Sequence, residues 1–356
     1  MKKVLLLLLC INISIPYVHA STSSAYEYVL MDMDSGRVLA SKNMNNPKLI
    51  ASITKIMTCI LAIENANVND IVKVDESISK SYGSGIYISV GEEIKLLDLL
   101  YGLMLRSGND AAIMISNYVS GSEEEFVKLM NMKAKEIGMK NTIFYNSSGL
   151  DTATIGNKST AYDMAILTKY AMKNSIYQEI VKTKKYVVKT NLKTYVWYNK
   201  NKLLNYDYIT GGKTGYTERA KRTLVSTASK YSMNFIVVTI QDSDDWNTHK
   251  SLYEYAFDNY RNIKIINKNN FQVLKDNYYD KLYILNDVYL TIKKDESKSL
   301  VSHIKLTKNR NYKDNDKVGV NYIYIGNTLV HQEDIYAKKC NSKENIITKI
   351  QKWFHK

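Results

Sequence analysis

The sequence predicts an α+β fold: an antiparallel sheet with packed helices and a helical subdomain, followed by a small all-β domain. Two patterns support the first part. Apolar and polar residues alternate over 26–42, as they do in half-buried strands, and strand-like runs return at 224–228 and 235–240. Between these strands, apolar residues recur at helical spacing, most clearly in 52–66 and 95–106. Strands at both ends of a helical middle are typical of an antiparallel sheet covered by helices.

A change of composition after Arg261 predicts the second domain. Short β-rich runs follow there, with turn signals at Asn286-Asp287 and Gly326-Asn327. A chain of 356 residues is long enough for two domains that each have a core. We therefore expect a first domain over 21–261 and a β-rich domain over 262–340.

The first twenty residues predict a signal peptide rather than a folded element. Lys2 and Lys3 precede an apolar stretch that begins at Val4, and Val18-His19-Ala20 places small residues at the outer cleavage positions. The stretch is too short to span a bilayer well. We expect export, and therefore a location at the outer face of the cytoplasmic membrane or in the cell wall.

The chain is strongly basic, with a formal net charge of +14 and a pI of about 9.3. Export argues against a nucleic-acid partner, because the polyanions outside the membrane are lipid headgroups and wall polymers. A basic surface favours both, and simple solvation by surface lysines is an equally open interpretation. The Cys and His residues show no metal-ligand spacing, so we expect neither a metal nor another cofactor.

The end of the chain, 341–356, predicts an amphipathic helix. An apolar stripe with basic flanks suits a helix that lies on an anionic membrane surface, and the segment is too short and too charged to span one. The alternative is that the stripe packs on the β domain. The apolar residues are Ile346, Ile347, Ile350, Trp353 and Phe354, and the basic ones are Lys343, Lys349, Lys352 and Lys356.

Three short signatures carry the chemistry. They are Ser52-Ile53-Thr54-Lys55, Ser107-Gly108-Asn109 and Lys213-Thr214-Gly215, in that order. Together they are the signature set of penicillin-interacting serine acyl-transfer enzymes. Each is weak alone, since Ser77 and Ser302 also begin Ser-Xaa-Xaa-Lys runs.

The setting of Ser52 distinguishes it from the other serines. It opens an apolar run at helical spacing, and free N–H groups and the positive dipole at a helix start favour developing negative charge. Residues three apart share a helix face, so the Lys55 amine can reach the Ser52 hydroxyl. A lysine with the usual pKa of about 10.4 acts as a base at neutral pH only if burial or a positive neighbour favours its neutral form, and Lys213 is the expected neighbour.

With these motifs, the chain resembles the low-molecular-mass penicillin-binding proteins, which are serine-type D-alanyl-D-alanine carboxypeptidases with a β-lactamase/transpeptidase-like fold. The resemblance runs almost continuously from Tyr26 to Phe257, and the trailing β domain is similar to the family's C-terminal module. Further matching runs are Gly138-Met139-Lys140-Asn141-Thr142, Ser148-Gly149-Leu150-Asp151, Ser159-Thr160-Ala161-Tyr162-Asp163 and Asn201-Lys202-Leu203-Leu204.

The resemblance implies removal of the terminal D-Ala from peptidoglycan stem pentapeptides through an acyl-enzyme, and inhibition by β-lactam antibiotics. It assigns catalysis to Ser52, Lys55 and Ser107: nucleophile, base and proton relay. It also assigns residues to substrate binding. Asn109 would bind the substrate amide, Lys213 and Thr214 would bind the terminal carboxylate, and Gly215 would allow close approach of the strand. The N–H of Tyr216 would form the oxyanion hole together with that of Ser52.

Two other functions stay open. A class A-like β-lactamase shares the three signatures but needs a Glu between the second and third, and there is none between Glu136 and Glu179. A turnover-deficient penicillin-binding wall protein is the other. A Ser-His-Asp hydrolase lacks support, because no Gly-Xaa-Ser-Xaa-Gly elbow is present.

One departure from the family pattern stands near the third signature. Where the family has Ala-Gly, Ala220 is followed by Lys221. We expect this side chain to crowd or re-charge the wall of the site and so to affect substrate preference. A smaller difference is Gly212, where the family often has an aliphatic residue.

Overall fold

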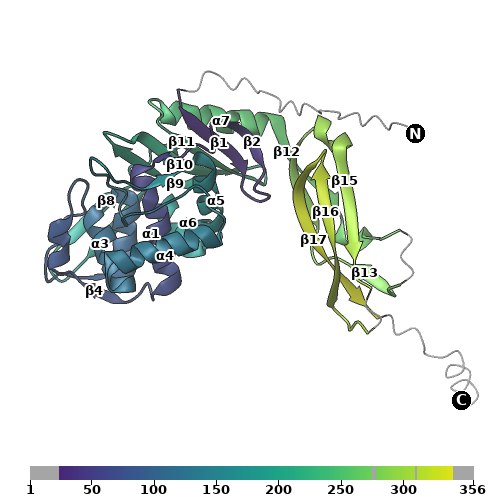
Figure 1. Ribbon diagram of the computed structural model, residues 1–356, viewed down its shortest axis with the longest axis horizontal. Coiled ribbons are helices and arrows are strands. Elements are labelled where there is room, and N and C mark those ends of the chain that lie inside the picture. Colours follow the sequence, from purple (N-terminus) through teal and green to yellow (C-terminus); the bar gives the residue numbers. More distant parts are fainter. Residues whose placement is uncertain (1–23, 275–277, 309–310, 340–356) are drawn as a thin grey trace, which may run out of the picture.

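The computed structural model describes residues 24–274, 278–308 and 311–339 (Figure 1). Its first domain is built on a five-stranded antiparallel sheet in the order β2-β1-β11-β10-β9. The first strands of the described chain pair with late ones, as Glu27 pairs with Ile240. The strands are β1 (Glu27–Asp32), β2 (Val38–Lys42), β9 (Ile209–Thr217), β10 (Lys221–Lys230) and β11 (Met233–Ile240).

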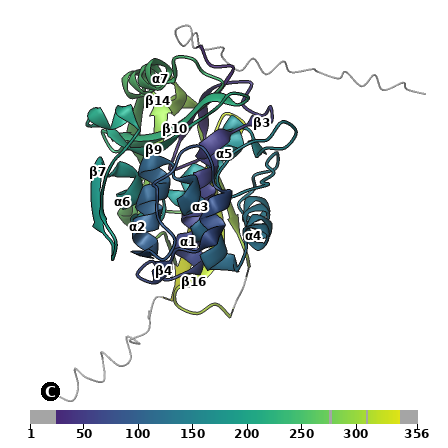
Figure 2. The ribbon, with the colours of Figure 1, turned by 90° about the vertical axis from the view of Figure 1, so that its left-hand side faces the viewer.

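Helices cover both faces of this sheet. On β1, Val29 and Met31 pack into one core and Tyr28 and Leu30 into the other, because successive side chains of a strand point to opposite faces. The first core includes α1 (Lys55–Asn65), α5 (Ala161–Ala171) and α6 (Ser175–Lys182). The second includes α7 (Asp245–Asn259), which lies at the top in Figure 2.

The helical subdomain continues the first core away from the sheet, and Figure 2 shows it in front. Its helices are α2 (Leu96–Tyr101), a π-helical turn (Gly102–Arg106), α3 (Asn109–Ser120) and α4 (Glu123–Glu136). Three two-stranded sheets and three 3-10 turns complete the first domain: β3 (Lys48–Leu49) with β6 (Lys158–Ser159), β4 (Ile71–Lys73) with β5 (Glu93–Lys95), β7 (Lys185–Lys189) with β8 (Thr194–Tyr198), η1 (Ala51–Thr54), η2 (Glu76–Lys80) and η4 (Lys202–Asn205).

The second domain is all-β with its own apolar core, and it follows α7 directly. One sheet pairs β12 (Tyr260–Ile266) with β14 (Val288–Lys293), and the other has the order β13-β17-β16-β15. Arg37 of the first domain forms a mostly buried ion pair with Glu296, and Asn262 Nδ2 donates to the Ser232 carbonyl at 2.7 Å. The remaining elements are β13 (Lys281–Tyr283), β15 (Leu300–Leu306), β16 (Asp316–Ile325), β17 (Thr328–Lys338), η5 (Lys268–Asn270) and η6 (Asp295–Ser299).

The predicted fold class is confirmed, and two predicted helices differ in detail. The helix expected over 52–66 begins as η1 and becomes α-helical only at Lys55. The helix expected over 95–106 divides into α2 and the π-helical turn, which ends at Ser107 in a left-handed conformation. The predicted signal peptide and C-terminal helix lie outside the described residues. Within the described part of the chain, no helix is long and apolar enough to cross a membrane.

Candidate active site

Ser52 and Lys55 lie on the turn that leads from η1 into α1. Lys55 is completely buried, and its Nζ donates to Ser52 Oγ at 3.1 Å. The same amine donates to Asn109 Oδ1 at 2.7 Å and to the Ser148 carbonyl at 2.6 Å. The expected pairing of serine and lysine is therefore present, and two further segments of the chain complete the environment of the amine.

Burial and a nearby positive charge lower the affinity of the Lys55 amine for its proton. Loss of water, and then the positive charge of Lys200, lower the pKa of Lys55 to about 7, while the Asp110 carboxylate acts in the opposite direction. We expected Lys213 as the positive neighbour. Lys55 and Lys213 do interact through their charges, and Lys200 is a further positive neighbour that no sequence motif singled out, because its influence depends on position in space.

The second and third signatures meet through Lys213. This lysine is buried, and its Nζ donates to Ser107 Oγ at 3.1 Å and to the Thr214 carbonyl at 2.7 Å. Burial first, and then the charges of Lys55 and Lys200, hold the pKa of Lys213 well below its usual value. Ser107 thus accepts a hydrogen bond from Lys213, and Asn109, two residues further along the chain, accepts one from Lys55.

Gly215 allows β9 to lie against the nucleophile turn. A Cβ at this position would be 2.4 Å from Thr223 Oγ1 and 3.0 Å from the Ser52 nitrogen, so any side chain would push the strand away. Thr223 Oγ1 in turn donates to the Ile50 carbonyl at 3.0 Å. Gly215 therefore lets the strand approach the turn that carries Ser52, and its expected close approach to the substrate backbone stays a prediction.

An open pocket of about 450 Å³ lies in front of these groups. It contains Ser52, Asn109 and Tyr216 of the predicted set, whereas Lys55, Ser107 and Lys213 are buried and are not part of its lining. A slightly larger cavity of about 480 Å³ lies elsewhere and includes none of the predicted residues. The remaining lining residues of the first pocket are Gly83, Ser84, Leu150, Asp151, Thr152, Ala153, Thr217, Glu218 and Arg219.

The loop 145–157 is a part of the site that the motifs indicated only as a matching run. Asn157 Nδ2 donates to Thr54 Oγ1 at 3.0 Å, which fastens the loop to the nucleophile turn. Gly149 has a φ of 87°, and a Cβ there would lie 2.0 Å from the Ala51 carbonyl oxygen. The only signal in the sequence for this contact is the glycine itself.

Lys221 agrees with only part of the expectation, because it does not crowd the pocket wall but its charge lies near Glu218 of the pocket lining. Its side chain is 60% exposed, its Nζ is 3.9 Å from Glu218 Oε2, and it is absent from the pocket lining described above. The expectation that it crowds the wall is wrong, because the side chain points to solvent. The φ of Lys221 is 56°, a left-handed backbone conformation that is strained for residues other than glycine. This offers a different reason why the family has glycine where this chain has Lys221.

The other serines are accounted for by structural contacts. The Ser77 hydroxyl accepts a hydrogen bond from Asn117 at 3.0 Å and contacts Met114. Ser226 Oγ lies 2.6 Å from His249 Nδ1, but both residues are completely buried, and burial lowers the pKa of His249 to about 3. A neutral, inaccessible histidine under the sheet gives no Ser-His hydrolase site.

The comparisons with known proteins agree with this geometry. The D-alanyl-D-alanine carboxypeptidase family matches residues 16–244, and the C-terminal domain of penicillin-binding protein 5 matches residues 260–343. The chain therefore belongs to the D-alanyl-D-alanine carboxypeptidase family, the low-molecular-mass penicillin-binding proteins.

Individual relatives carry the same description. D-alanyl-D-alanine carboxypeptidase DacF of Bacillus subtilis is 37% identical over 68% of this chain, and DacC of Escherichia coli is 33% identical over 67%. The chain matches less than two thirds of these relatives, 64% and 63% of their lengths. The crystal structure of penicillin binding protein 5 from Haemophilus influenzae is similar over 90% of this chain and 98% of that chain, with a TM-score of 0.74 and 25% identity.

Gly149→Ala is predicted to disrupt the site sterically. The new methyl group would collide with the Ala51 carbonyl, so we expect a loss of about 2–5 kcal/mol in the free energy of unfolding and much slower acylation at the adjacent Ser52. Gly138→Ala is the matched control, because Gly138 has nearly the same φ of 88° and no atom within 4 Å of the added Cβ. Urea unfolding and the rate of penicillin labelling measure both effects. Equal losses in the two variants would show that backbone strain alone is responsible.

Proposed function

We propose that this protein is a serine-type D-alanyl-D-alanine carboxypeptidase that removes the terminal D-Ala from peptidoglycan stem pentapeptides and is acylated by β-lactams. The observation that carries the proposal is the contact of 3.1 Å between the Ser52 hydroxyl and the buried Lys55 amine at the floor of an open pocket. Family membership supports the same activity.

Acylation begins with transfer of the Ser52 hydroxyl proton to Lys55 Nζ. Ser52 Oγ forms a bond to the penultimate carbonyl carbon, and the N–H groups of Ser52 and Tyr216 receive the negative charge of the oxygen. The C–N bond then breaks, and the proton held by Lys55 reaches the leaving D-Ala amine through Ser107. Deacylation reverses the order: water attacks the ester, its proton goes to Lys55, and Ser52 regains its hydroxyl.

Substrate recognition uses the groups around this centre. Asn109 has its amide bonded to Lys55 and to Tyr82, but one more donor and one more lone pair remain for a substrate amide. Lys213 donates to Ser107, and its amine would also donate to the terminal carboxylate, whose negative charge favours the protonated form of the lysine; Thr214 lies beside it on β9. The free carboxylate distinguishes this substrate from an internal peptide bond.

The alternatives find less support. The pocket lining contains two carboxylates: Asp151, whose Oδ2 lies 3.6 Å from Arg219 Nη1, and Glu218, whose Oε1 accepts a hydrogen bond from the Tyr216 hydroxyl at 2.7 Å. An ion-paired aspartate is a poor water activator, so the β-lactamase alternative is not favoured. A turnover-deficient penicillin-binding protein would need the same base for acylation, so the assay for released D-Ala is what separates that alternative.

Ser52→Ala is expected to abolish both penicillin labelling and D-Ala release, a loss on the order of 10⁴-fold or more, because both reactions need the same oxygen. Ser77→Ala is the control, since Ser77 begins a decoy motif and is bonded to Asn117. A labelled-penicillin gel combined with an assay for D-Ala measures both. The proposal fails if Ser52→Ala is still labelled, and rapid hydrolysis of the drug would favour the β-lactamase.

The acylation rate is expected to depend on pH through Lys55. Only the neutral amine accepts the proton, so the rate rises with pH and levels off above about 7, falling roughly tenfold per pH unit below that value. Lys200→Met removes the positive neighbour and should shift the midpoint to higher pH, because the charged form of Lys55 becomes less unfavourable. Lys202→Met, at an exposed position nearby, is the control. If the midpoint of the pH profile is the same in Lys200→Met, Lys200 does not influence the pKa of Lys55.

We extend the proposal to location. Residues 1–20 act as a signal peptide, and the C-terminal helix over 341–356 holds the exported enzyme on the outer face of the membrane. The support is the residue pattern of both segments.

Truncation after Asn341 is expected to abolish binding to anionic liposomes while D-Ala release from soluble peptide continues. Each lysine near anionic headgroups contributes about 1 kcal/mol, so the full chain should dissociate at high salt. Sedimentation with anionic and with neutral vesicles measures the difference. If the truncated chain still binds, or unfolds at lower temperature while the full chain never binds, the helix packs on the β domain instead.

A further inference from the structure

The segment 82–87 forms one wall of the active-site pocket, to which it contributes Ser84. Asn109 binds the start of this segment: its Nδ2 donates to the Tyr82 carbonyl at 2.6 Å, and its backbone N–H donates to the Ser84 carbonyl at 2.8 Å. Because the same side chain accepts a hydrogen bond from Lys55, the wall is bonded to a residue that positions the catalytic amine.

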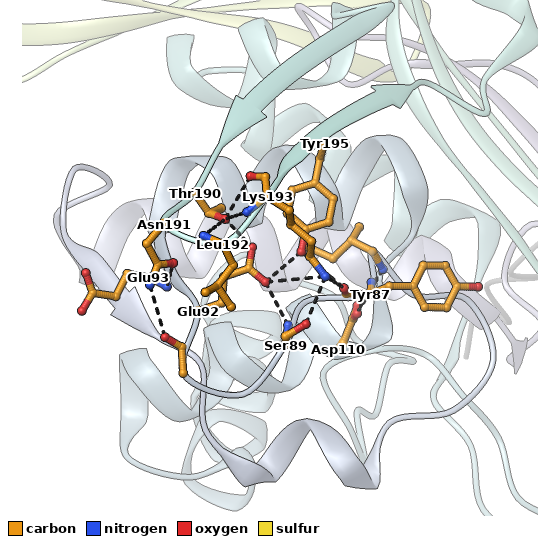
Figure 3. Close-up of polar contacts among 12 residues, drawn as sticks. Tyr87, Ser89, Glu92, Glu93, Asp110, Thr190, Asn191, Leu192, Lys193 and Tyr195 are labelled. Atoms are coloured by element: carbon orange, nitrogen blue, oxygen red, sulfur yellow. Dashed lines mark hydrogen bonds and ion pairs between the residues drawn. The ribbon is translucent and has the colours of Figure 1, made fainter.

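The end of the segment is bound just as firmly by the next residue of α3. The buried Asp110 carboxylate accepts hydrogen bonds from the Ile86 nitrogen at 3.0 Å and from the Tyr87 nitrogen at 2.7 Å. Figure 3 shows Asp110 close to the backbone of Tyr87. The path of the backbone is therefore determined at both ends by the first turn of one helix.

The β7–β8 hairpin holds Tyr87 from the opposite side. Lys193 Nζ and the Tyr195 hydroxyl donate to the Tyr87 carbonyl at 2.7 and 3.3 Å. Both donors are themselves held by Glu92, which is completely buried: it accepts from Tyr195 at 2.8 Å and lies 3.9 Å from Lys193 Nζ (Figure 3).

These contacts hold Tyr87 in a strained conformation with its ring in water. The φ of 61° is left-handed, which costs an aromatic residue about 1–3 kcal/mol. Tyr87 is 75% exposed as a residue, and its ring points away from the polar contacts in Figure 3, so it adds little to the core. Tyr82, at the other end of the segment, is 59% exposed. A strained backbone that presents an apolar ring beside a pocket is typical of a ligand contact.

We propose that Tyr82 and Tyr87 form a saccharide subsite that holds a sugar of the glycan strand to which the stem peptide is attached, an inference that rests on the proposed function. A tyrosine offers an apolar face and a hydroxyl at its edge. A pyranose ring has the complementary form, with C–H groups on its faces and hydroxyls around its edge. The two rings can stack while their hydroxyls stay hydrated or hydrogen-bonded.

The dimensions agree with this assignment. Four extended residues separate the scissile carbonyl from the sugar, which is a span of roughly 13–14 Å. Tyr87 follows Ser84, which lines the pocket, by three residues, so their Cα atoms are at most about 11 Å apart. These maximal lengths allow the ring of Tyr87 to contact a sugar whose peptide enters the pocket.

The test compares two substrates that differ only in the sugar: a free pentapeptide and the same pentapeptide attached to its disaccharide. We expect Tyr87→Ala to lower the preference for the disaccharide substrate, measured as the ratio of the two kcat/KM values, by roughly three- to tenfold. Tyr87→Phe keeps the stacking ring and should retain most of the preference. Tyr231→Ala is the matched control, because Tyr231 is 67% exposed with a φ of 55° and lies in the turn between β10 and β11.

A second measurement does not depend on turnover. Binding of the disaccharide alone to the Ser52→Ala protein, followed by NMR, should weaken when Tyr87→Ala is added and stay the same when Tyr231→Ala is added. The inference is overturned if Tyr87→Ala lowers both kcat/KM values equally, which would indicate a peptide contact, or if disaccharide binding does not change. Absence of D-Ala release from both substrates by the unaltered enzyme would instead contradict the proposed function.

Discussion

The site depends on the complete burial of one amine. Transfer of an ammonium group out of water is unfavourable, so Lys55 is kept near neutrality beside the hydroxyl that it must deprotonate. The carbonyl of Ser148 and the side chain of Asn109 accept hydrogen bonds from it, at 2.6 and 2.7 Å. Three segments that are far apart in the sequence must therefore meet around a single atom, and the first domain is arranged so that they do.

Two close backbone contacts keep that arrangement rigid. β9 approaches the nucleophile turn where Gly215 leaves no side chain, and the loop 145–157 approaches it where Gly149 leaves none. Hydrogen bonds from Thr223 and Asn157 fasten the same turn from both sides. The nucleophile is thereby held between a strand and a loop, which is the preorganisation that acyl transfer requires.

Hydrogen bonds also connect the pocket wall to the catalytic residues. Asn109 binds both the catalytic amine and the segment 82–87, and Asp110 and Glu92 continue the network to the β7–β8 hairpin. The outer wall is thus connected to the inner site by a chain of hydrogen bonds. The second domain has its own core and contacts the first through the Arg37–Glu296 ion pair, away from this network.

Local pattern in the sequence was sufficient for the fold class and for the chemical groups. Alternation and helical spacing predicted the sheet and its helices, and the three signatures predicted the meeting of Ser52, Lys55, Ser107 and Lys213. Tertiary structure alone decided the rest. The effect of Lys200 on Lys55 and the close contact at Gly149 arise between segments that are distant in sequence, and the exposure of Lys221 is likewise a property of its place in the fold. Desolvation, distance between charges and steric contact are properties of positions in space, so a motif can name the reacting groups but not the environment that sets their reactivity.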